Sequence, residues 1–370
     1  MRSIFQYIIL LILLTMAAAP IPARDVPALS EKSDPAEKAR VQHLINEARR
    51  IGTFSWISGA ILPGQGAKIT RAFQAYYGLN DLKTNYLYAS TFEVTSRVEQ
   101  LLMARRNTFD VVWNAAYPWY PDLLRRGELL RYESPNYKAF TLSEAAGYNM
   151  HGYWVSFGYA FTPAYNPAAL RKLGITNFQF SSYKDLVNPR LKGLVSIGNL
   201  NSSMQSTSTM IALQHQIGGN WFRRLVSTVK PTPTTVAAQG RDWLASGEFP
   251  IAITTLARDR LMLRQKHIDI RSPMPKEGVL IIPFPPVILK SALNPAAAKL
   301  FIDYITSIRG AQMIQDAGAM LFVGRPGVRS PAPDILPAWE NVKVIPFNWV
   351  KDGSRANVER YRDLFYDADG

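Results

Sequence analysis

The sequence contains no cysteine and only four histidines among its 370 residues. Without thiols the chain can form no disulfide, no thiolate metal site, no cysteine nucleophile and no lipid-modified N-terminal cysteine. The histidines are His43, His151, His215 and His267, and no two of them have the H-x-x-x-H spacing of a helical metal site. A G-x-S-x-G nucleophile elbow is also absent. We therefore predict no enzyme activity, no catalytic residue, no bound metal and no cofactor.

Long apolar runs are scarce as well, and the one that occurs lies at the N-terminus. Arg2 precedes the apolar stretch Ile4–Ala19, and Ile21-Pro22-Ala23 follows as a cleavage site before Arg24. This order of a positive residue, an apolar run and small residues is typical of a secretory signal peptide. We predict that residues 1–23 are removed and that the mature protein is soluble and periplasmic. A retained N-terminal anchor is the alternative.

The charge balance is basic, with a formal net charge of +14. A positive surface attracts nucleic acid, anionic membranes or anionic solutes. The Lys and Arg residues are scattered and form no long basic run, so we expect no nucleic-acid partner. A small anionic solute remains as the partner that this charge favours.

Apolar periodicity alternates between strand-like and helix-like segments, which predicts an α/β fold with mainly parallel sheets. The expected strands are Thr53–Ser58, Asn85–Ala89, Phe109–Trp113, Leu194–Gly198, Pro250–Thr254 and Gly278–Phe284. Helices are expected at 35–50, around 94–102, and at 204–217, 235–245 and 294–307. Ligands of such sheets lie beyond the carboxyl ends of the strands.

Two segments without helical periodicity predict crossings between two lobes. The first is the aromatic stretch Gly152–Asn166, and the second is Ile268–Gly278, where two prolines interrupt any helix. The predicted organisation is a polar leader and N-terminal helix (24–51), a discontinuous first lobe (52–150 and 277–325), a second lobe (151–276) and a C-terminal tail packed on the second lobe (326–370).

The loop after the first strand has two glycines, Gly59 and Gly64, at the spacing of a phosphate-binding P-loop. A P-loop requires Lys and then Ser or Thr after the second glycine, because these side chains hold the phosphates and Mg²⁺. Gln65 and Gly66 stand there instead. We therefore interpret the loop as a site for another polar or anionic ligand at a helix N-terminus.

The loops expected at the carboxyl ends of the strands are polar, nearly uncharged and able to donate hydrogen bonds. The candidate ligand-binding residues are Ser58, Gly59, Ser90, Thr91, Asn114, Tyr117, Ser202, Ser203, Gln205, Thr254, Thr255 and Arg258. Ser202 and Ser203 lie where a helix starts and could hold an anion. Arg258, with Arg241 as a second candidate, could bind a phosphate or carboxylate bidentately. For each Ser, Thr or Asn the alternative is ordinary capping and turn chemistry.

Several stretches resemble the periplasmic solute-binding proteins of ABC importers, in the cluster that contains the iron(III)-binding proteins. In chain order these are EARRIGTFSWIS, FDVVW with LLRRGELLRY, FSSYKDLVNPRLKGLVSIGN, WLASGEFPIAI and LNPAAAKLFIDYITSIRGAQMI. The resemblance implies a two-lobed type II Venus-flytrap fold with two doubly wound sheets and a hinge, in which closure buries a ligand between the lobes. It also implies a monomer that delivers its solute to an ABC permease in the inner membrane.

The same resemblance also allows a prediction of whether this chain binds iron(III). The iron-binding members use His, Glu and a Tyr-Tyr pair, and the matching positions here fall near Leu62, Ala115 and Leu256-Ala257. None of these side chains can ligate a hard cation. The pair Tyr76-Tyr77 lies on the helix after the first loop, which favours packing. We therefore expect a small anionic organic solute. The alternatives are an iron(III)-anion binder and a periplasmic sensor subunit, with a hydrolase as a further possibility.

The signal-peptide prediction can be tested on the secreted protein. Mass spectrometry of the chain recovered from the periplasmic fraction should show a mass that lacks residues 1–23. A mass that includes them, recovered from the membrane fraction, would establish the retained anchor instead.

Overall fold

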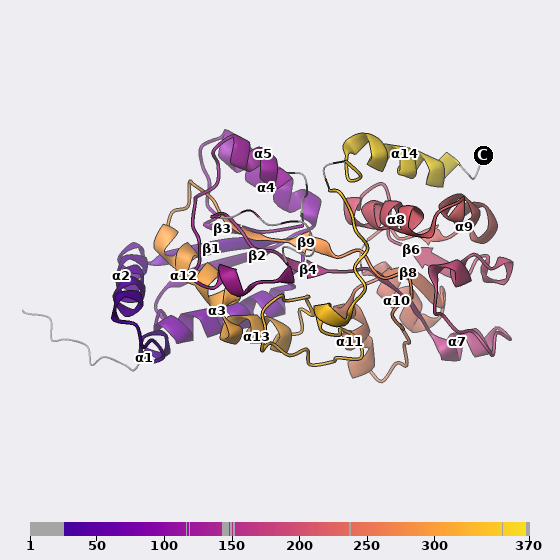
Figure 1. Ribbon diagram of the computed structural model, residues 1–370, viewed down its shortest axis with the longest axis horizontal. Helices are drawn as coiled ribbons and strands as arrows, with labels where there is room; N and C mark the ends of the chain where they lie inside the picture. The colour runs from indigo at the N-terminus through magenta and orange to yellow at the C-terminus, as the bar shows by residue number, and fades with distance from the viewer. Residues whose placement is uncertain are drawn as a thin grey trace, which may run out of the picture.

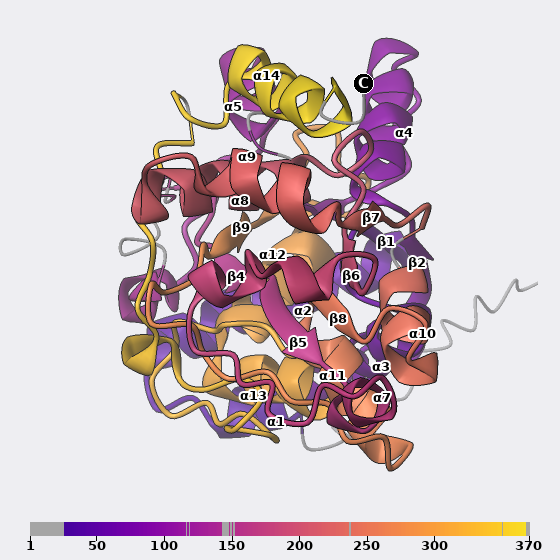
Figure 2. The same ribbon diagram turned by 90° about the vertical axis from the view of Figure 1, so that its right-hand side faces the viewer.

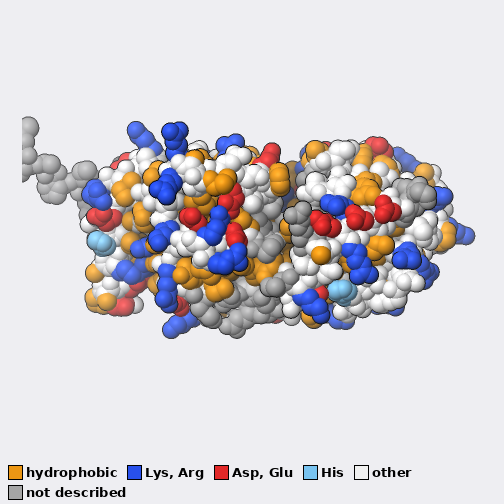
Figure 3. Space-filling model, turned by 90° about the horizontal axis from the view of Figure 1, so that it is seen from above, with side chains coloured by type: hydrophobic (Ala, Val, Ile, Leu, Met, Phe, Trp, Pro, Cys, Tyr) orange, Lys and Arg blue, Asp and Glu red, His pale blue; other side chains and the backbone are white. Residues whose placement is uncertain are grey.

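The computed structural model describes residues 26–367 apart from 116, 118, 143–147, 149, 151, 237 and 350, so the predicted signal peptide lies outside the described residues. The molecule is elongated, and two lobes lie side by side along its long axis (Figure 1). Among the described residues, no helix combines the length and the apolar character that a membrane crossing requires. Figure 3 shows Lys and Arg side chains distributed over both lobes on the face it displays.

Lobe 1 is built on a four-stranded sheet. Its strands are β1 (Thr53–Ser58), β2 (Lys83–Tyr88), β3 (Val111–Trp113) and β10 (Pro286–Ile288), in the order β10-β3-β1-β2. β1 pairs in parallel with both β2 and β3. β10, which comes from much later in the chain, pairs antiparallel with β3. The sheet is therefore closed on one edge by a segment that has returned from lobe 2.

Helices cover both faces of this sheet. They are α1 (Pro27–Ser30), α2 (Pro35–Ile51), α3 (Pro63–Tyr77), α4 (Thr91–Met103), α5 (Trp119–Arg125), η1 (Tyr137–Ala139), α12 (Pro295–Thr306) and α13 (Ile308–Asp316). α2 begins where Asp34 accepts a hydrogen bond from the Ala36 N–H, as an N-cap should. α12 packs on α2, and α13 packs on α3. Phe54, Phe73 and Phe301 fill the space between them with ring centroids 5.2–5.5 Å apart.

Lobe 2 repeats this plan with a second four-stranded sheet. Its strands are β5 (Thr162–Tyr165), β6 (Val195–Ile197), β7 (Thr232–Pro233) and β8 (Ile251–Thr255), in the order β5-β8-β6-β7. Its helices are α7 (Pro167–Lys172), η2 (Tyr183–Leu186), η3 (Pro189–Leu191), α8 (Met204–Ile217), α9 (Trp221–Val229), α10 (Gln239–Ser246) and α11 (Ala257–Gln265). α8 and α9 lie on one side of the sheet, and α10 and α11 lie on the other (Figure 2).

The two lobes are joined by a short antiparallel pair of strands, β4 (Phe157–Tyr159) and β9 (Ile282–Phe284). A third connecting segment lies beside this pair, where Phe322 pairs with Gly158 of β4. The tail then runs through η4 (Trp339–Asn341) to α14 (Arg355–Tyr366), which packs on α8 and α9. The chain therefore crosses between the lobes three times, and the tail makes the third crossing (Figure 1).

The predicted two-lobed α/β fold with mainly parallel sheets is confirmed. The strand expected at Thr53–Ser58 is β1 with the same bounds, whereas the strand expected at Gly278–Phe284 is confined to Ile282–Phe284 in β9. Sequence periodicity missed the antiparallel edge strands β5 and β10, because each belongs to a segment that is apolar on both faces. The domain boundaries given above stay a prediction.

A buried polar network holds the returning chain in lobe 1. Asp110, which is 1% exposed, accepts hydrogen bonds from the backbone N–H groups of Ser55 (2.7 Å) and Asn294 (2.7 Å). The Asn294 amide donates to the carbonyls of Ala48 (3.0 Å) and Thr53 (2.8 Å). Burial raises the pKa of Asp110, and the backbone N–H groups oppose that rise. Two side chains thus connect α2, β1, β3 and the start of α12.

Helix α3 of lobe 1 is held against the sheet through a glycine. A Cβ atom at Gly66 would overlap the ring of Tyr86, whereas a Cβ at Gly64 in the same helix would meet no atom within 4 Å. Tyr86 stacks on Trp56 with 4.0 Å between ring centroids and donates a hydrogen bond to the carbonyl of Ile61. The absence of a side chain at Gly66 therefore lets β2 support the loop that follows β1.

We predict that Gly66→Ala lowers the free energy of unfolding by about 1–3 kcal/mol, because the new methyl group displaces the Tyr86 ring. Gly64→Ala is the matched control and should be neutral or stabilising by up to about 1 kcal/mol, because alanine is the better helix former. Urea unfolding of both variants measures the difference. Equal stability of the two variants would contradict this packing.

Candidate functional site

The carboxyl ends of the central strands of both lobes lie at the surface where the lobes meet. Two hydrogen bonds cross between the lobes there. Gln205 Nε2, on α8, donates to the carbonyl of Ala115 at 2.9 Å. Arg258, on α11, donates from Nη1 to the carbonyl of Ala60. We call the region around Ala60, Ala115, Gln205 and Arg258 the interlobe junction.

The lobe 1 side of the junction is a tight group of polar residues. Ser58 is fully buried, and its hydroxyl accepts from the N–H groups of Ala60 and Ile61, both at 3.3 Å. Gly59 donates its N–H to the carbonyl of Trp113, and a Cβ there would overlap Asn114 Oδ1. Ser58 therefore shapes the loop, and its hydroxyl is engaged within the protein.

Asn114 and Thr91 are brought together beside Gly59. Asn114 Nδ2 donates to the carbonyl of Thr91 (3.1 Å) and to the hydroxyl of Thr95 (3.3 Å). Asn114 Oδ1 is buried and has no hydrogen-bond partner. A buried acceptor without a donor costs free energy. Asn114 is therefore an acceptor that a hydroxyl or N–H of a bound molecule would satisfy.

Two other lobe 1 candidates are engaged elsewhere. Ser90 is exposed and caps α4, where its hydroxyl accepts from the Glu93 N–H (3.2 Å) and Glu93 accepts from the Ser90 N–H (2.8 Å). The ring of Tyr117 is buried edge-on against Tyr148 and against Trp349 of the tail. Capping and aromatic packing account for both residues in this structure.

The lobe 2 side gathers three hydroxyls around Gly198. Thr254 Oγ1 accepts from the Gly198 N–H at 2.6 Å, and a Cβ at Gly198 would overlap the hydroxyl of Ser206. Ser206 Oγ donates to Ser203 Oγ at 2.9 Å. Thr255 turns away from this group and donates to the carbonyl of Thr162 at 2.7 Å. Ser203, Ser206 and Thr254 thus form a hydroxyl cluster at the ends of β6 and β8.

The loop before α8 supplies fewer free donors than the sequence suggests. Asn199 Oδ1 accepts from the N–H groups of Asn201 (2.8 Å) and Ser202 (3.2 Å), and from the hydroxyl of Tyr366 on α14 (3.2 Å). Ser202 itself is exposed. The backbone donors expected to hold an anion are therefore bound to an asparagine side chain, and direct contact of Ser202 with a ligand stays a prediction.

Arg258 places a positively charged side chain at the interlobe junction. The side chain is 11% exposed, and its Nε lies 3.9 Å from Asp259 Oδ1 without a hydrogen-bond partner. Arg241 approaches the same carboxylate oxygen at 4.0 Å. Burial raises the pKa of Asp259, and the two arginines oppose that rise. Arg241 is itself paired with Asp242 at 2.9 Å, so Asp259 is the carboxylate beside Arg258 at the junction.

Tyr86, Tyr159 and Ser206 lie near the junction but are not among the residues predicted from the sequence. Burial raises the pKa values of both tyrosines, and the nearby positive charge of Arg258 acts to lower them, so both phenols are protonated at neutral pH. Tyr86 and Tyr88 alternate along β2, and this pattern is the signal that could have placed one of them at the carboxyl end of the sheet. Nothing in the sequence around Tyr159 predicts its position, whereas Ser206 ends the loop 199–206 that the sequence places beyond a strand end.

The positions that correspond to iron ligands carry Leu62, Ala115, Leu256 and Ala257. Among the described residues, no group of three or more His, Cys, Asp or Glu side chains could hold a metal ion. Ala115 contributes a carbonyl to the junction, where it accepts from Gln205. Tyr77 is buried in lobe 1 against Phe73, and Tyr76 packs on Tyr304. The Tyr76-Tyr77 pair therefore serves helix packing.

A separate groove lies on the outer side of lobe 1. It has a volume of about 1020 Å³ and lies between α3, α12, α13 and the loop at 325–329. Arg309 there forms an ion pair with Glu31 at 2.6 Å and lies over the ring of Tyr76. None of the candidate residues lines this groove, so it is separate from the interlobe junction.

Comparison with known proteins places the chain among binding proteins. A family model described as bacterial extracellular solute-binding protein matches residues 129–352, which is more than half of the chain. No curated protein matches the sequence.

Solved structures show the same fold at low identity. The periplasmic binding protein AfuA from Actinobacillus pleuropneumoniae, with exogenous fructose-6-phosphate bound, is 20% identical with a TM-score of 0.70, over 85% of this chain and 98% of that one. Iron-bound HitA from Pseudomonas aeruginosa is 18% identical with a TM-score of 0.65, over 85% and 99%. Apo ferric ion-binding protein A from Pasteurella haemolytica is 15% identical with a TM-score of 0.66, over 86% and 98%.

We predict that Gln205→Met weakens the contact between the lobes, because it removes the hydrogen bond to Ala115 while keeping the length of the side chain. A hydrogen bond worth about 0.5–1.5 kcal/mol changes the ratio of separated to touching lobes by about 2- to 12-fold. Because the chain has no cysteine, spin labels can be placed selectively at Met103→Cys and Leu173→Cys, whose native side chains are 73% and 53% exposed.

Pulsed electron resonance should then show a longer or broader distance distribution for Gln205→Met. Gln214→Met is the control, because the amide of Gln214 donates within lobe 2, to the carbonyl of Gly219 at 2.7 Å. Identical distributions for both variants and the parent would show that Gln205 does not hold the lobes together.

Proposed function

The chain belongs to the bacterial extracellular solute-binding protein family, and from that premise we propose that it captures a small anionic organic solute, most simply a phosphorylated compound, at the interlobe junction. Proteins of this kind work outside the cytoplasmic membrane and deliver their solute to an ABC permease. Capture at the junction, anionic selectivity and a monomeric state are the proposed parts.

The observation that carries the proposal is the buried guanidinium of Arg258, whose Nε has no hydrogen-bond partner. Its side chain is 11% exposed, and its nearest carboxylate oxygen is 3.9 Å away. Buried charges are normally paired. A phosphate or carboxylate presents two oxygens at the spacing of two guanidinium N–H groups. Arg258 is therefore prepared for an anion that is not part of the chain.

Asn114 supports a ligand that carries a hydrogen-bond donor beside its anionic group. Its buried Oδ1 needs a donor, and the oxygens of a fully ionised carboxylate or phosphate group accept but do not donate. A hydroxyl group of the solute can donate to it. The hydroxyls of Ser203, Ser206 and Thr254 on lobe 2 offer further partners that both donate and accept.

The residues at the positions that correspond to iron ligands favour an organic anion over iron for this chain. AfuA holds a sugar phosphate and HitA holds iron in their solved structures. At the positions that correspond to iron ligands this chain has Leu62, Ala115, Leu256 and Ala257, whose side chains provide no donor for iron(III). The proposal of an anionic organic solute rests on this difference together with Arg258.

During capture of a solute, the two lobes would separate and close about the hinge. In the structure the lobes touch through Arg258 and the carbonyl of Ala60. A solute anion would replace that carbonyl as the partner of Arg258 when the lobes separate and close again. Closure around the ligand excludes water, which strengthens each charge-assisted hydrogen bond. The chain needs no catalytic step for this role, and a sensor subunit would use the same junction.

The first experiment is a thermal-shift screen of protein that has been unfolded and refolded to remove carried-over ligand. The panel contains organophosphates, di- and tricarboxylates, sugars, amino acids, polyamines and ferric salts. A ligand at 100 times its dissociation constant stabilises the native state by about 2.7 kcal/mol. We expect an organophosphate to raise the melting temperature. A response only to neutral or cationic solutes would contradict the anionic assignment and leave the fold unaffected.

For the solute so identified, Arg258→Met should weaken binding about 10- to 100-fold, because a hydrogen bond to a charged group contributes about 1.5–3 kcal/mol. Arg264→Met on the same helix is the control. Arg264 is 46% exposed and pairs with Asp334 at 2.8 Å, away from the junction. Titration calorimetry measures both variants. An equal, small effect of the two substitutions would show that Arg258 does not contact the solute.

A further inference from the structure

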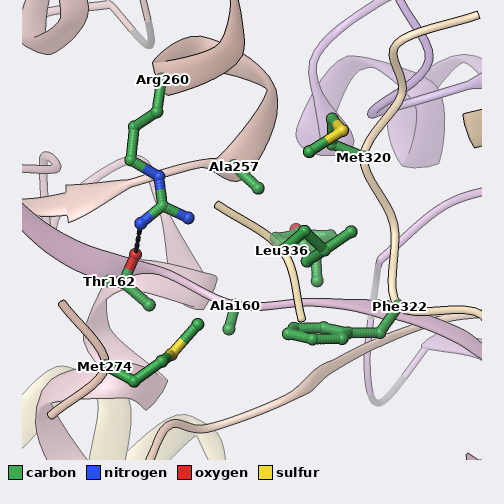
Figure 4. A pocket seen from close by; sticks show the side chains of 9 residues that line it. Ala160, Thr162, Ala257, Arg260, Met274, Met320, Phe322 and Leu336 are labelled. Atoms are coloured by element: carbon green, nitrogen blue, oxygen red, sulfur yellow. Dashed lines mark hydrogen bonds between the residues drawn. The ribbon is translucent and has the colours of Figure 1, made fainter. Parts of the chain in front are cut away.

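A small cavity lies at the hinge, close to the interlobe junction but outside it. Its volume is about 10 Å³, which is room for one particle of about the size of a water molecule. It is lined by Tyr159, Ala160, Thr162, Ala257, Arg260, Met274, Met320, Phe322 and Leu336. Apart from Arg260, Thr162 and the phenol of Tyr159, these side chains are apolar (Figure 4).

Arg260 is buried at the edge of this cavity without a counter-ion in contact. It is 3% exposed. Nη1 donates to the hydroxyls of Thr162 (2.6 Å) and Ser272, and Nη2 donates to the carbonyl of Ile335 at 3.1 Å. All three acceptors are neutral, and Nε is buried with no partner.

The acidic residues nearest to Arg260 are paired with other arginines. Asp259 lies close to Arg241 and Arg258 on the side of the junction. Asp334 is 70% exposed and pairs with Arg264. Desolvation lowers the pKa of Arg260 to about 10, so the guanidinium still carries its full charge at neutral pH. A buried, uncompensated cation is costly unless an anion accompanies it.

The geometry points to a binding site for one small monovalent inorganic anion of the size of chloride, held at the hinge by Arg260. In Figure 4 the Nε side of the guanidinium faces the cavity wall at Ala257, while the opposite side is bound to Thr162. The anion would accept from Nε–H. Chloride is slightly larger than water, and the flexible side chains of Met274 and Met320 can move to admit it.

This site would be coupled to the hinge because its walls include two of the segments that join the lobes. Ala160 and Thr162 belong to the first crossing, and Phe322 and Leu336 belong to the tail. The remaining wall is α11, which also carries Arg258 to the interlobe junction. A bound anion would therefore stabilise one relative placement of the lobes without contacting the captured solute.

The test measures halide binding by the full mature chain without any organic ligand. Thermal unfolding is followed in sodium bromide, sodium chloride and sodium gluconate at equal ionic strength. We expect a saturable rise of a few degrees with bromide and chloride relative to gluconate. In crystals grown with bromide, an anomalous peak should lie within hydrogen-bond distance of Arg260 Nε. Equal melting temperatures in all three salts, or water in the cavity of bromide-grown crystals, would overturn the proposal.

Substitutions at Arg260, Arg264 and Ala257 test whether the halide response comes from this cavity. Arg260→Met should lose the halide response, whereas Arg264→Met, which removes an exposed arginine from the same helix, should keep it. If Arg260→Met does not fold, Ala257→Val serves instead, because it fills the cavity and leaves the guanidinium in place. Retention of the halide response in Ala257→Val would place the anion elsewhere and refute the site. The outcome is independent of the solute screen, because no organic ligand is present.

Discussion

The hydrogen bonds of Asp110 and Asn294 hold together a lobe whose chain leaves it and later returns. Asp110 joins β1 and β3 to the backbone of Asn294, and Asn294 in turn binds the end of α2 and the start of β1. This closure holds the start of α12 against lobe 1, where β10 also pairs with β3 and α12 packs on α2. Because the chain must return, it must also cross between the lobes, and the crossings create both the hinge and the surface where the lobes meet.

The crossings bring two buried arginines, Arg258 and Arg260, to places where segments of both lobes meet. Arg258 and Arg260 lie two residues apart on α11, and each has an Nε without a partner. Arg258 faces lobe 1 across the interlobe junction, and Arg260 faces the hinge cavity. One helix therefore supplies both a candidate contact for the solute and a candidate site for a small anion. In the proposed roles, ligand capture and hinge geometry would be joined through this one helix.

Much of the local structure could be predicted because it depends on local patterns. β1 follows its apolar alternation, α2 follows its Asp-Pro start, and α8 follows its helical periodicity, and each lies where the sequence indicated. The polar loops at the strand ends were also predicted to converge, because the carboxyl ends of parallel strands share one edge of a sheet. Gly59, Asn114, Gln205, Thr254 and Arg258 do lie at or beside the interlobe junction, but their contact with a ligand is still untested.

The sequence by itself determined the α/β class, the two lobes, the absence of thiol chemistry and the polar, basic character of the loops, because composition and periodicity act on neighbouring residues. Only the tertiary structure decided which polar groups stay free. Ser58, Ser90 and Thr255 have the same composition signal as Asn114, yet their hydroxyls are bound within the protein while Asn114 Oδ1 is not. Likewise, the burial of Arg260 among neutral acceptors results from three distant segments meeting at the hinge. The hydroxyls of Ser58 and Ser90 are bound by near neighbours in the chain, whereas the surroundings of Asn114 and Arg260 depend on contacts between residues far apart in the chain.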